Sequence, residues 1–430
     1  MPVAQRLPSP YRPEAAIVSH RLLALANALD WAAAAQVAAP WVQAVRDNPP
    51  PFWAMESLLK EYPISSAEGL ALMRLAEALL RIPDIDTAIA LTADQLGRAD
   101  FAEGGDHVLS KLSSAAIALS KHFLPETSTD TPHKPGLMGT LGAKTVVAAT
   151  LRAVQLLGRQ FVLGQTMAEA LHEAQAARKK AGNTLTFSYD MLGEGARTER
   201  DAQRYLQSYQ DAIGFIAQHT QAGATPDKSD GISIKLSALH PRYEDAQSQR
   251  VMRELVPRVE GLCEMAAQAN INLTIDAEEV DRLELSLEVF EALVAWVAEH
   301  QPQWRGLGLA MQAYQTRALE LIDHVAQLGR THRVRLMCRL VKGAYWDAEI
   351  KRAQELGLPH YPVFTHKHHT DVSYLACARA LLAASDVIFP QFATTMQQPS
   401  QPFCRWAQKA GRRLNYSGCM AWARVCTVRY

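Results

Sequence analysis

The second half of the chain alternates short, almost continuously apolar runs with amphipathic stretches, and this alternation limits the fold more than any other feature. Between the runs lie segments such as ALELIDHVAQLGRTH, whose apolar residues recur at helical spacing. Uninterrupted apolar runs separated by helices predict parallel strands that are covered on both faces. The predicted strands span residues 186–192, 232–239, 271–276, 307–314, 334–341 and 387–394, with a weaker one at 361–366.

Polar or charged side chains stand at the C-terminal end of nearly every predicted strand. Such strands can close into a (βα)8 barrel or form an open doubly wound sheet. Barrel enzymes place their chemistry at the C-terminal ends of all their strands, whereas a doubly wound sheet gathers it at one switch point. We therefore expect an α/β fold and favour a (βα)8 barrel, with the open doubly wound sheet as the alternative. The strand-end residues are Asp190, Glu194, Lys235, Asp276, Glu278, Glu279, Gln312, Arg339 and Lys342.

The chain as a whole predicts four segments. Residues 52–124 show helical patterning, and a long helical segment is expected from 141 to 180, after a polar, proline-rich loop. The predicted domains are an N-terminal arm (1–50), an α-helical domain (51–165), the barrel (166–394) and an aberrant tail (395–430).

Composition excludes several classes of protein. Lys+Arg and Asp+Glu both number 44, and this balance gives no support to nucleic-acid binding through a basic face. The sequence has no apolar run of about 18 residues, so no membrane-spanning helix is expected. Six cysteines at no paired spacing, and an N-terminus without an apolar core, predict a reduced cytoplasmic protein without zinc or disulfides.

The chemistry-bearing residues point to a site without a metal. His366, His368 and His369 occur together in THKHH, but on an extended segment only the first two share a face. Asp371 is the nearest carboxylate, so we expect a solvated loop there.

Lys235 and Asp276 would lie on neighbouring strands and pair across the mouth of the barrel. Charges of both signs at that place must be paired or bind a ligand. The sequence has neither GxGxxG after a strand nor GxxxxGK[ST]. We therefore expect neither a dinucleotide nor a nucleoside triphosphate to be held by the usual glycine-rich loop.

Several long motifs resemble the proline dehydrogenase half of the bacterial bifunctional proline utilisation A flavoenzymes. EGLALMRLAEALLRIPD and YDMLGEGA are similar to its helical domain and first barrel strand. The resemblance covers about 340 residues in the right order. The other motifs are GISIKLSALHPRY (231–243), IDAEEVDRLELSL (275–287), MQAYQTR (311–317), CRLVKGAYWDAEIKRAQ (338–354), HTDVSYLACA (369–378) and FPQFAT (389–394).

The resemblance implies a distorted (βα)8 barrel that holds FAD at its C-terminal face. It also implies oxidation of L-proline to Δ1-pyrroline-5-carboxylate, with electrons passed to membrane quinone. It places Arg339 beside the flavin N5, Gln312 near the isoalloxazine edge, and Lys235 at the substrate carboxylate. Asp276 and Tyr345 would shape the proline pocket. The remaining implied FAD contacts are Val341, Lys342, Gly343, Ala344, Trp346 and Thr394. The resemblance also implies a cytoplasmic protein, with peripheral contact to the inner membrane as an alternative.

The resemblance is expected to end at Thr394. The family's last strand and helix are not recognisable in the tail, which has six basic residues and no acidic one. A shifted reading frame near Thr394 explains this tail better than divergence, and an inactive truncated fragment is therefore the alternative to an active enzyme. Neither the family's ribbon-helix-helix nor its aldehyde dehydrogenase domain is recognisable, so no nucleic-acid partner is expected.

Overall fold

The computed structural model describes residues 6–26, 162–181, 185–191, 193–393 and 426–428, with isolated positions between 30 and 47. These belong to a compact unit formed by Met1–Asp47 and Val162–Tyr430. A second unit, Asn48–Phe161, lies outside the described residues, and so do the predicted helices within it. The predicted domain boundaries, and the frameshift in the tail, stay predictions.

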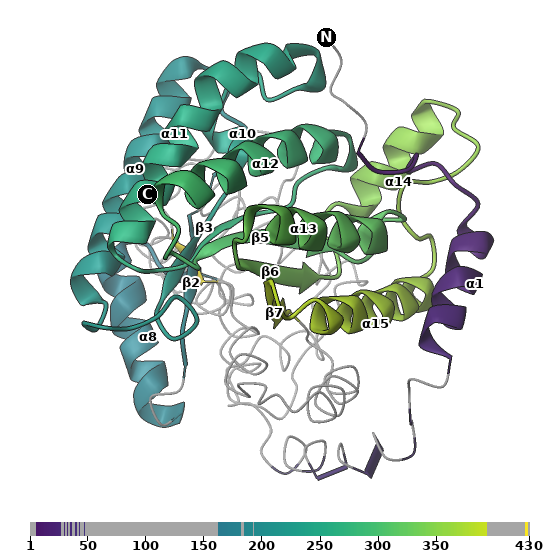
Figure 1. The fold of residues 1–430 in the computed structure, drawn as a ribbon, viewed down its shortest axis with the longest axis horizontal. Coiled ribbons are helices and arrows are strands. Elements are labelled where there is room, and N and C mark those ends of the chain that lie inside the picture. Colours follow the sequence, from purple (N-terminus) through teal and green to yellow (C-terminus); the bar gives the residue numbers. More distant parts are fainter. Residues whose placement is uncertain are drawn as a thin grey trace, which may run out of the picture. The chain divides into compact units, whose positions relative to one another are not determined.

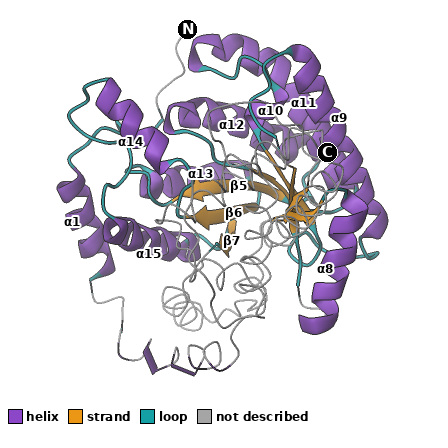
Figure 2. Cartoon of the chain, turned by 180° about the vertical axis from the view of Figure 1, so that it is seen from behind, coloured by secondary structure: helices purple, strands orange, loops and turns teal. Residues whose placement is uncertain are grey.

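One sheet of eight parallel strands forms the centre of the described unit, with helices around it (Figures 1 and 2). The strand order is β1-β8-β2-β3-β4-β5-β6-β7. The strands are β1 (Val162–Gly164), β2 (Ser188–Met191), β3 (Gly231–Ile234), β4 (Leu273–Ile275), β5 (Leu307–Gln312), β6 (Leu336–Val341), β7 (Ile388–Phe392) and β8 (Cys426–Val428).

Helices follow most of the strands along the chain, and α1 precedes them. Two short 3-10 turns, Asp245–Gln247 and Val280–Arg282, lead into α11 and α12. The helices are α1 (Glu14–Leu25), α8 (Met167–Ala181), α9 (Glu199–His219), α10 (Leu236–Leu239), α11 (Ser248–Gln268), α12 (Leu283–His300), α13 (Ala318–His332), α14 (Trp346–Glu355) and α15 (Lys367–Ala383).

The apolar strands form the core because both of their faces are covered. Every residue of β3, β4 and β5 is buried, as the uninterrupted apolar runs predict. The surrounding helices are amphipathic. Helix α9, for example, begins at a capping box in which Thr198 and Asp201 bond each other's backbone N–H groups, and it buries Tyr209 and Ile213.

A hydrogen bond across the sheet shows that the sheet is rolled up. Strands β2 and β6 are four places apart, so a flat sheet would separate them by about 19 Å. Yet Arg339 Nη2 on β6 lies 2.8 Å from Ser188 Oγ on β2, and Arg339 Nη1 lies 2.8 Å from Ser233 Oγ on β3. The side chains therefore meet inside a curved sheet, which confirms the expected distorted α/β barrel.

Several local expectations differ from the structure. The strand expected over 232–239 ends at Ile234, and Leu236–Leu239 form helix α10. The strand expected at 361–366 is wrong, because Val363 makes only an isolated antiparallel bridge to Gln315 and helix α15 starts at Lys367. The helix expected over 141–180 is interrupted by β1, and α8 begins only at Met167. The tail, in which no strand was expected, contributes β8 between β1 and β2. The β-branched residues of VCTV favour an extended backbone, but three residues are too few to show a period.

Candidate functional site

Lys235 lies at the centre of a charged cluster in the barrel mouth. It directly follows β3, and its Nζ lies 2.8 and 3.0 Å from the two carboxylate oxygens of Asp190 and 3.1 Å from Asp276 Oδ2. The backbone N–H of Lys235 donates to Tyr209 Oη at 3.1 Å, which holds the residue against helix α9. The predicted pairing of Lys235 with Asp276 is thus confirmed, and Asp190 joins it from β2.

Arg339 extends the same cluster from the opposite side of the barrel. Its guanidinium is buried and lies 3.6 Å from Asp276 Oδ1, in addition to its bonds to Ser188 and Ser233. The two serine hydroxyls lie 3.1 Å from each other. Two cations and two carboxylates therefore share one mouth, an arrangement in which burial is tolerable because the charges offset one another.

Burial and mutual charge shift the pKa values of this cluster. Burial, and then the charge of Asp276, raise the pKa of Asp190 from 3.8 to about 6. Burial opposes the charge of Lys235, but Asp276 and Asp190 outweigh it and raise the Lys235 pKa above its ordinary value. Burial lowers the pKa of Arg339 to about 10. Both cations stay charged at neutral pH, and the Asp190 carboxyl group titrates just below it.

A backbone turn after β6 forms the neighbouring part of the site. Gly343 adopts φ +142°, and a Cβ there would lie 2.5 Å from the ring of Tyr314. The Ala344 N–H donates to Gln312 Oε1 at 3.2 Å, and Gln312 Nε2 donates to the carbonyl of Glu278 at 2.8 Å. The amide of Gln312 thus fixes the turn against the end of β5, and only a residue without a side chain fits at Gly343.

Three residues of this turn bond to different partners. Lys342 donates to Asp371 Oδ1 at 2.5 Å. The backbone N–H of Tyr345 donates to Tyr314 Oη at 3.3 Å, and burial raises the pKa of the Tyr345 phenol. Trp346 donates its indole N–H to the Phe364 carbonyl at 2.9 Å and keeps 41% of its surface exposed.

The structure therefore gathers the predicted residues into two adjoining groups. The charged cluster contains Lys235, Asp276 and Arg339. The turn after β6 contains Lys342, Gly343, Ala344, Tyr345 and Trp346, with Gln312 bonded to it. Val341 ends β6, and its carbonyl accepts the N–H of Ala313 at 2.8 Å. Thr394 lies outside the described residues. The individual roles that the family resemblance implies stay predictions.

Sequence reasoning named Asp190 only as a strand-end residue and missed Ser188 and Ser233, although the pattern of these residues is readable. Ser188 and Asp190 are two residues apart on β2, and Ser233 and Lys235 have the same spacing on and just after β3. Residues two apart in a strand share a face, so polar residues at this spacing within an apolar run indicate an inward-facing polar row. This signal would have placed Asp190 beside Lys235.

The turn after β6 fits a flavin cofactor better than it fits a metal. It offers an exposed indole at Trp346 and the ammonium group of Lys342. An aromatic surface and a cation suit a dinucleotide with a planar ring and phosphates. The buried guanidinium of Arg339 lies within the adjoining cluster, where it would face negative charge on such a ring.

In the described part of the chain, no helix combines the length and apolar character that crossing a membrane requires. Peripheral membrane contact stays a prediction.

Family comparisons match both halves of the chain. The family description "Proline dehydrogenase" matches residues 171–418, more than half of the chain, and "DNA-binding domain of Proline dehydrogenase" matches residues 54–161. The first match continues past Thr394, where the resemblance was expected to end. The second runs against the expectation that the chain binds no nucleic acid. Because residues 54–161 lie outside the described residues, that expectation stays a prediction.

Curated relatives and solved structures agree with these matches. The bifunctional protein PutA of Klebsiella aerogenes is 47% identical over 348 residues, covering 79% of this chain and 26% of the relative. The PutA of Rhizobium meliloti is 42% identical over 347 residues, with 79% and 27% covered. A crystal structure of Bradyrhizobium japonicum proline utilization A, mutant D779W, matches with a TM-score of 0.68 and 42% identity, covering 94% of this chain and 40% of that one. The chain thus spans about a quarter of the length of these curated relatives.

Proposed function

Because the chain belongs to the proline dehydrogenase family, we propose that it oxidises L-proline to Δ1-pyrroline-5-carboxylate with FAD as cofactor and passes the electrons to a membrane quinone. The observation that carries this proposal is the cluster of Lys235 and Arg339 with two carboxylates in the barrel mouth. The quinone and the peripheral membrane contact rest on the family resemblance alone.

Lys235 is the group best suited to bind the carboxylate of proline. Its ammonium group is bonded to the carboxylates of Asp190 and Asp276, so the cation is held in place before a substrate arrives. A charge-assisted hydrogen bond from a cation that is already oriented costs little further ordering when a carboxylate binds. Asp190 and Asp276 act through Lys235 as positioning residues.

Arg339 is the group best suited to stabilise charge near the cofactor. FAD, when bound, supplies the two-electron acceptor for the oxidation of proline. A buried guanidinium stabilises developing negative charge more strongly than an exposed one, because water does not screen it. The hydroxyls of Ser188 and Ser233 hold the guanidinium in one orientation, so no reorganisation is needed during the reaction.

The turn at residues 342–346 is the proposed cofactor-binding segment. Gln312 holds the N–H of Ala344, and Tyr314 contacts the backbone at Gly343 and Tyr345. These contacts fix the backbone before FAD binds. Lys342, paired with Asp371, supplies positive charge for the phosphates.

The test is an assay of the purified, FAD-supplemented chain with L-proline and an artificial electron-accepting dye, with product trapped chemically and D-proline as the control. Activity with L-proline alone supports the proposal. The alternative, a fragment without catalytic function, draws support from the sheet order, since no pairing between β7 and β1 occurs among the described residues. Retention of FAD without any proline oxidation would favour that alternative.

A further inference from the structure

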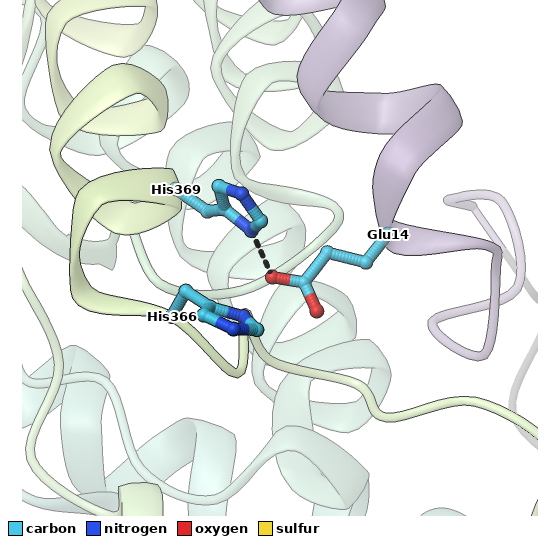
Figure 3. Close-up of side chains that lie close together, drawn as sticks. All are labelled: Glu14, His366 and His369. Atoms are coloured by element: carbon cyan, nitrogen blue, oxygen red, sulfur yellow. Dashed lines mark hydrogen bonds and ion pairs between the residues drawn. The ribbon is translucent and has the colours of Figure 1, made fainter.

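We propose that Glu14, His366 and His369 form a binding site for a divalent transition-metal ion of the zinc class, which links the start of helix α1 to the start of helix α15 (Figure 3). The three residues lie outside the charged cluster and outside the proposed cofactor-binding segment. The site therefore goes beyond the oxidation of proline.

The ligand atoms are close to the positions that such an ion requires. Each residue offers one ligand atom, and all three atoms lie within 4.8 Å of one another. Figure 3 shows the carboxylate of Glu14 facing both imidazole rings. A tetrahedral ion with bonds of about 2.0–2.1 Å holds its ligand atoms about 3.3 Å apart, so small side-chain rotations complete the site. Two imidazoles and one carboxylate form a ligand set that zinc takes in proteins.

Thr365 orients two of the ligands. Its backbone N–H donates to Glu14 Oε1 at 3.0 Å, and its hydroxyl donates to Glu14 Oε2 at 2.7 Å. Because that hydroxyl hydrogen is used, the contact of 2.9 Å between Thr365 Oγ1 and His366 Nδ1 requires the ring nitrogen to donate. His366 then presents an unprotonated Nε2, the form that binds a metal. Outer contacts of this kind set the tautomer and direction of metal ligands.

Glu14 and His369 already lie in contact. His369 Nδ1 is 2.5 Å from Glu14 Oε1. The carboxylate of Glu14 thus accepts hydrogen bonds from both Thr365 and His369. An ion at this place would draw His366 into the same contact and connect the two helices through three side chains.

The sequence pattern alone argues against this site because it pairs the wrong residues. On an extended segment, His366 and His368 would share a face, and Asp371 would be the nearest carboxylate. In the structure His366 is the residue that precedes helix α15, so His369 comes round to its side. The carboxylate comes from Glu14, 355 residues before His369.

The experiment is a zinc titration of the full chain, prepared without a histidine tag and stripped with a chelator, and compared with three variants. His366→Ala removes one ligand but leaves the Glu14–His369 pair. Glu14→Gln keeps an acceptor for Thr365 and removes the charge. His368→Ala is the matched control, since this exposed neighbour is not in the cluster.

We expect one Zn²⁺ per wild-type chain, and an affinity loss of at least about tenfold in His366→Ala and Glu14→Gln, because altering even an outer contact of a metal site costs that much. His368→Ala should bind as the wild type does. Zinc should raise the unfolding temperature of the wild type and of His368→Ala only. Equal affinity in all four proteins, or an equal loss in His368→Ala, would overturn the proposal, as would the absence of binding. An equal loss in His368→Ala would indicate a loose surface cluster. The absence of binding would indicate that Glu14 and His369 form a plain ion pair.

Discussion

The ammonium group of Lys235 donates hydrogen bonds to both carboxylate oxygens of Asp190, at 2.8 and 3.0 Å. A further bond joins the ammonium group to Asp276 Oδ2 at 3.1 Å. A proline carboxylate that binds Lys235 competes with these two carboxylates for the cation. The affinity for substrate therefore depends on how strongly the two aspartates hold the cation.

Substitution Lys235→Ala should raise the KM for proline by about tenfold to a hundredfold while FAD content changes little. The reason is the loss of a charge-assisted hydrogen bond, which contributes about 1.5–3 kcal/mol. Lys351→Ala is the matched control, because the Lys351 side chain is 76% exposed and pairs with Glu355 on the same helix. If FAD is lost while the KM holds, Lys235 serves the cofactor instead.

Substitution Asp190→Asn should change how stability depends on pH. The folded pKa of Asp190 is about 6, above its ordinary 3.8, so between about pH 4 and pH 6 the folded protein binds more protons at this group than the unfolded chain does. The contribution of Asp190 is therefore most favourable below about pH 4 and declines as the pH rises to about 6. Asparagine removes this slope.

Denaturant unfolding of both proteins across this range measures the effect. The free energy of unfolding of the wild type, minus that of Asp190→Asn, should fall as the pH rises. A constant difference would show that Asp190 ionises as an ordinary aspartate, and a difference that rises with pH would show that folding lowers its pKa.

Substitution Gly343→Ala should weaken FAD binding and lower stability by about 1–3 kcal/mol. The φ of +142° is unfavourable for alanine, and the new Cβ would lie 2.5 Å from the Tyr314 ring. Gly214→Ala in helix α9 is the control, since its Cβ would meet nothing within 4 Å. That change should be neutral or stabilising. FAD content and unfolding temperature are the measurements, and wild-type FAD content in Gly343→Ala would refute the assignment of the turn.

The fold was predictable where the sequence has a long apolar run. Strands β2 and β4 to β7 fall within the predicted runs, because burial on both faces leaves an uninterrupted apolar signal. Strand β3 begins one residue before its run, whose end forms helix α10. Strands β1 and β8 lie outside the predicted runs, and their pairing depends on distant parts of the chain. The run at 361–366 fails because Val363 and Phe364 are buried without belonging to a strand.

The sequence predicted the part of the site that follows from one rule, namely that the C-terminal ends of barrel strands converge. That rule placed Lys235 beside Asp276, whereas the contact of Arg339 with Ser188 depends on the curvature of the sheet. The proximity of Glu14 to His369 depends on how the N-terminal arm packs, which no local pattern records.

The most direct test of the central claim is anaerobic addition of L-proline to the FAD-loaded protein while the flavin absorbance is followed, with Arg339→Met beside the wild type. The account predicts bleaching of the wild-type flavin by L-proline, and greatly slowed bleaching in Arg339→Met with its fold intact. The claim would be contradicted by a wild-type flavin that a chemical reductant bleaches but L-proline does not. Full proline-dependent bleaching of Arg339→Met would remove Arg339 from its proposed role.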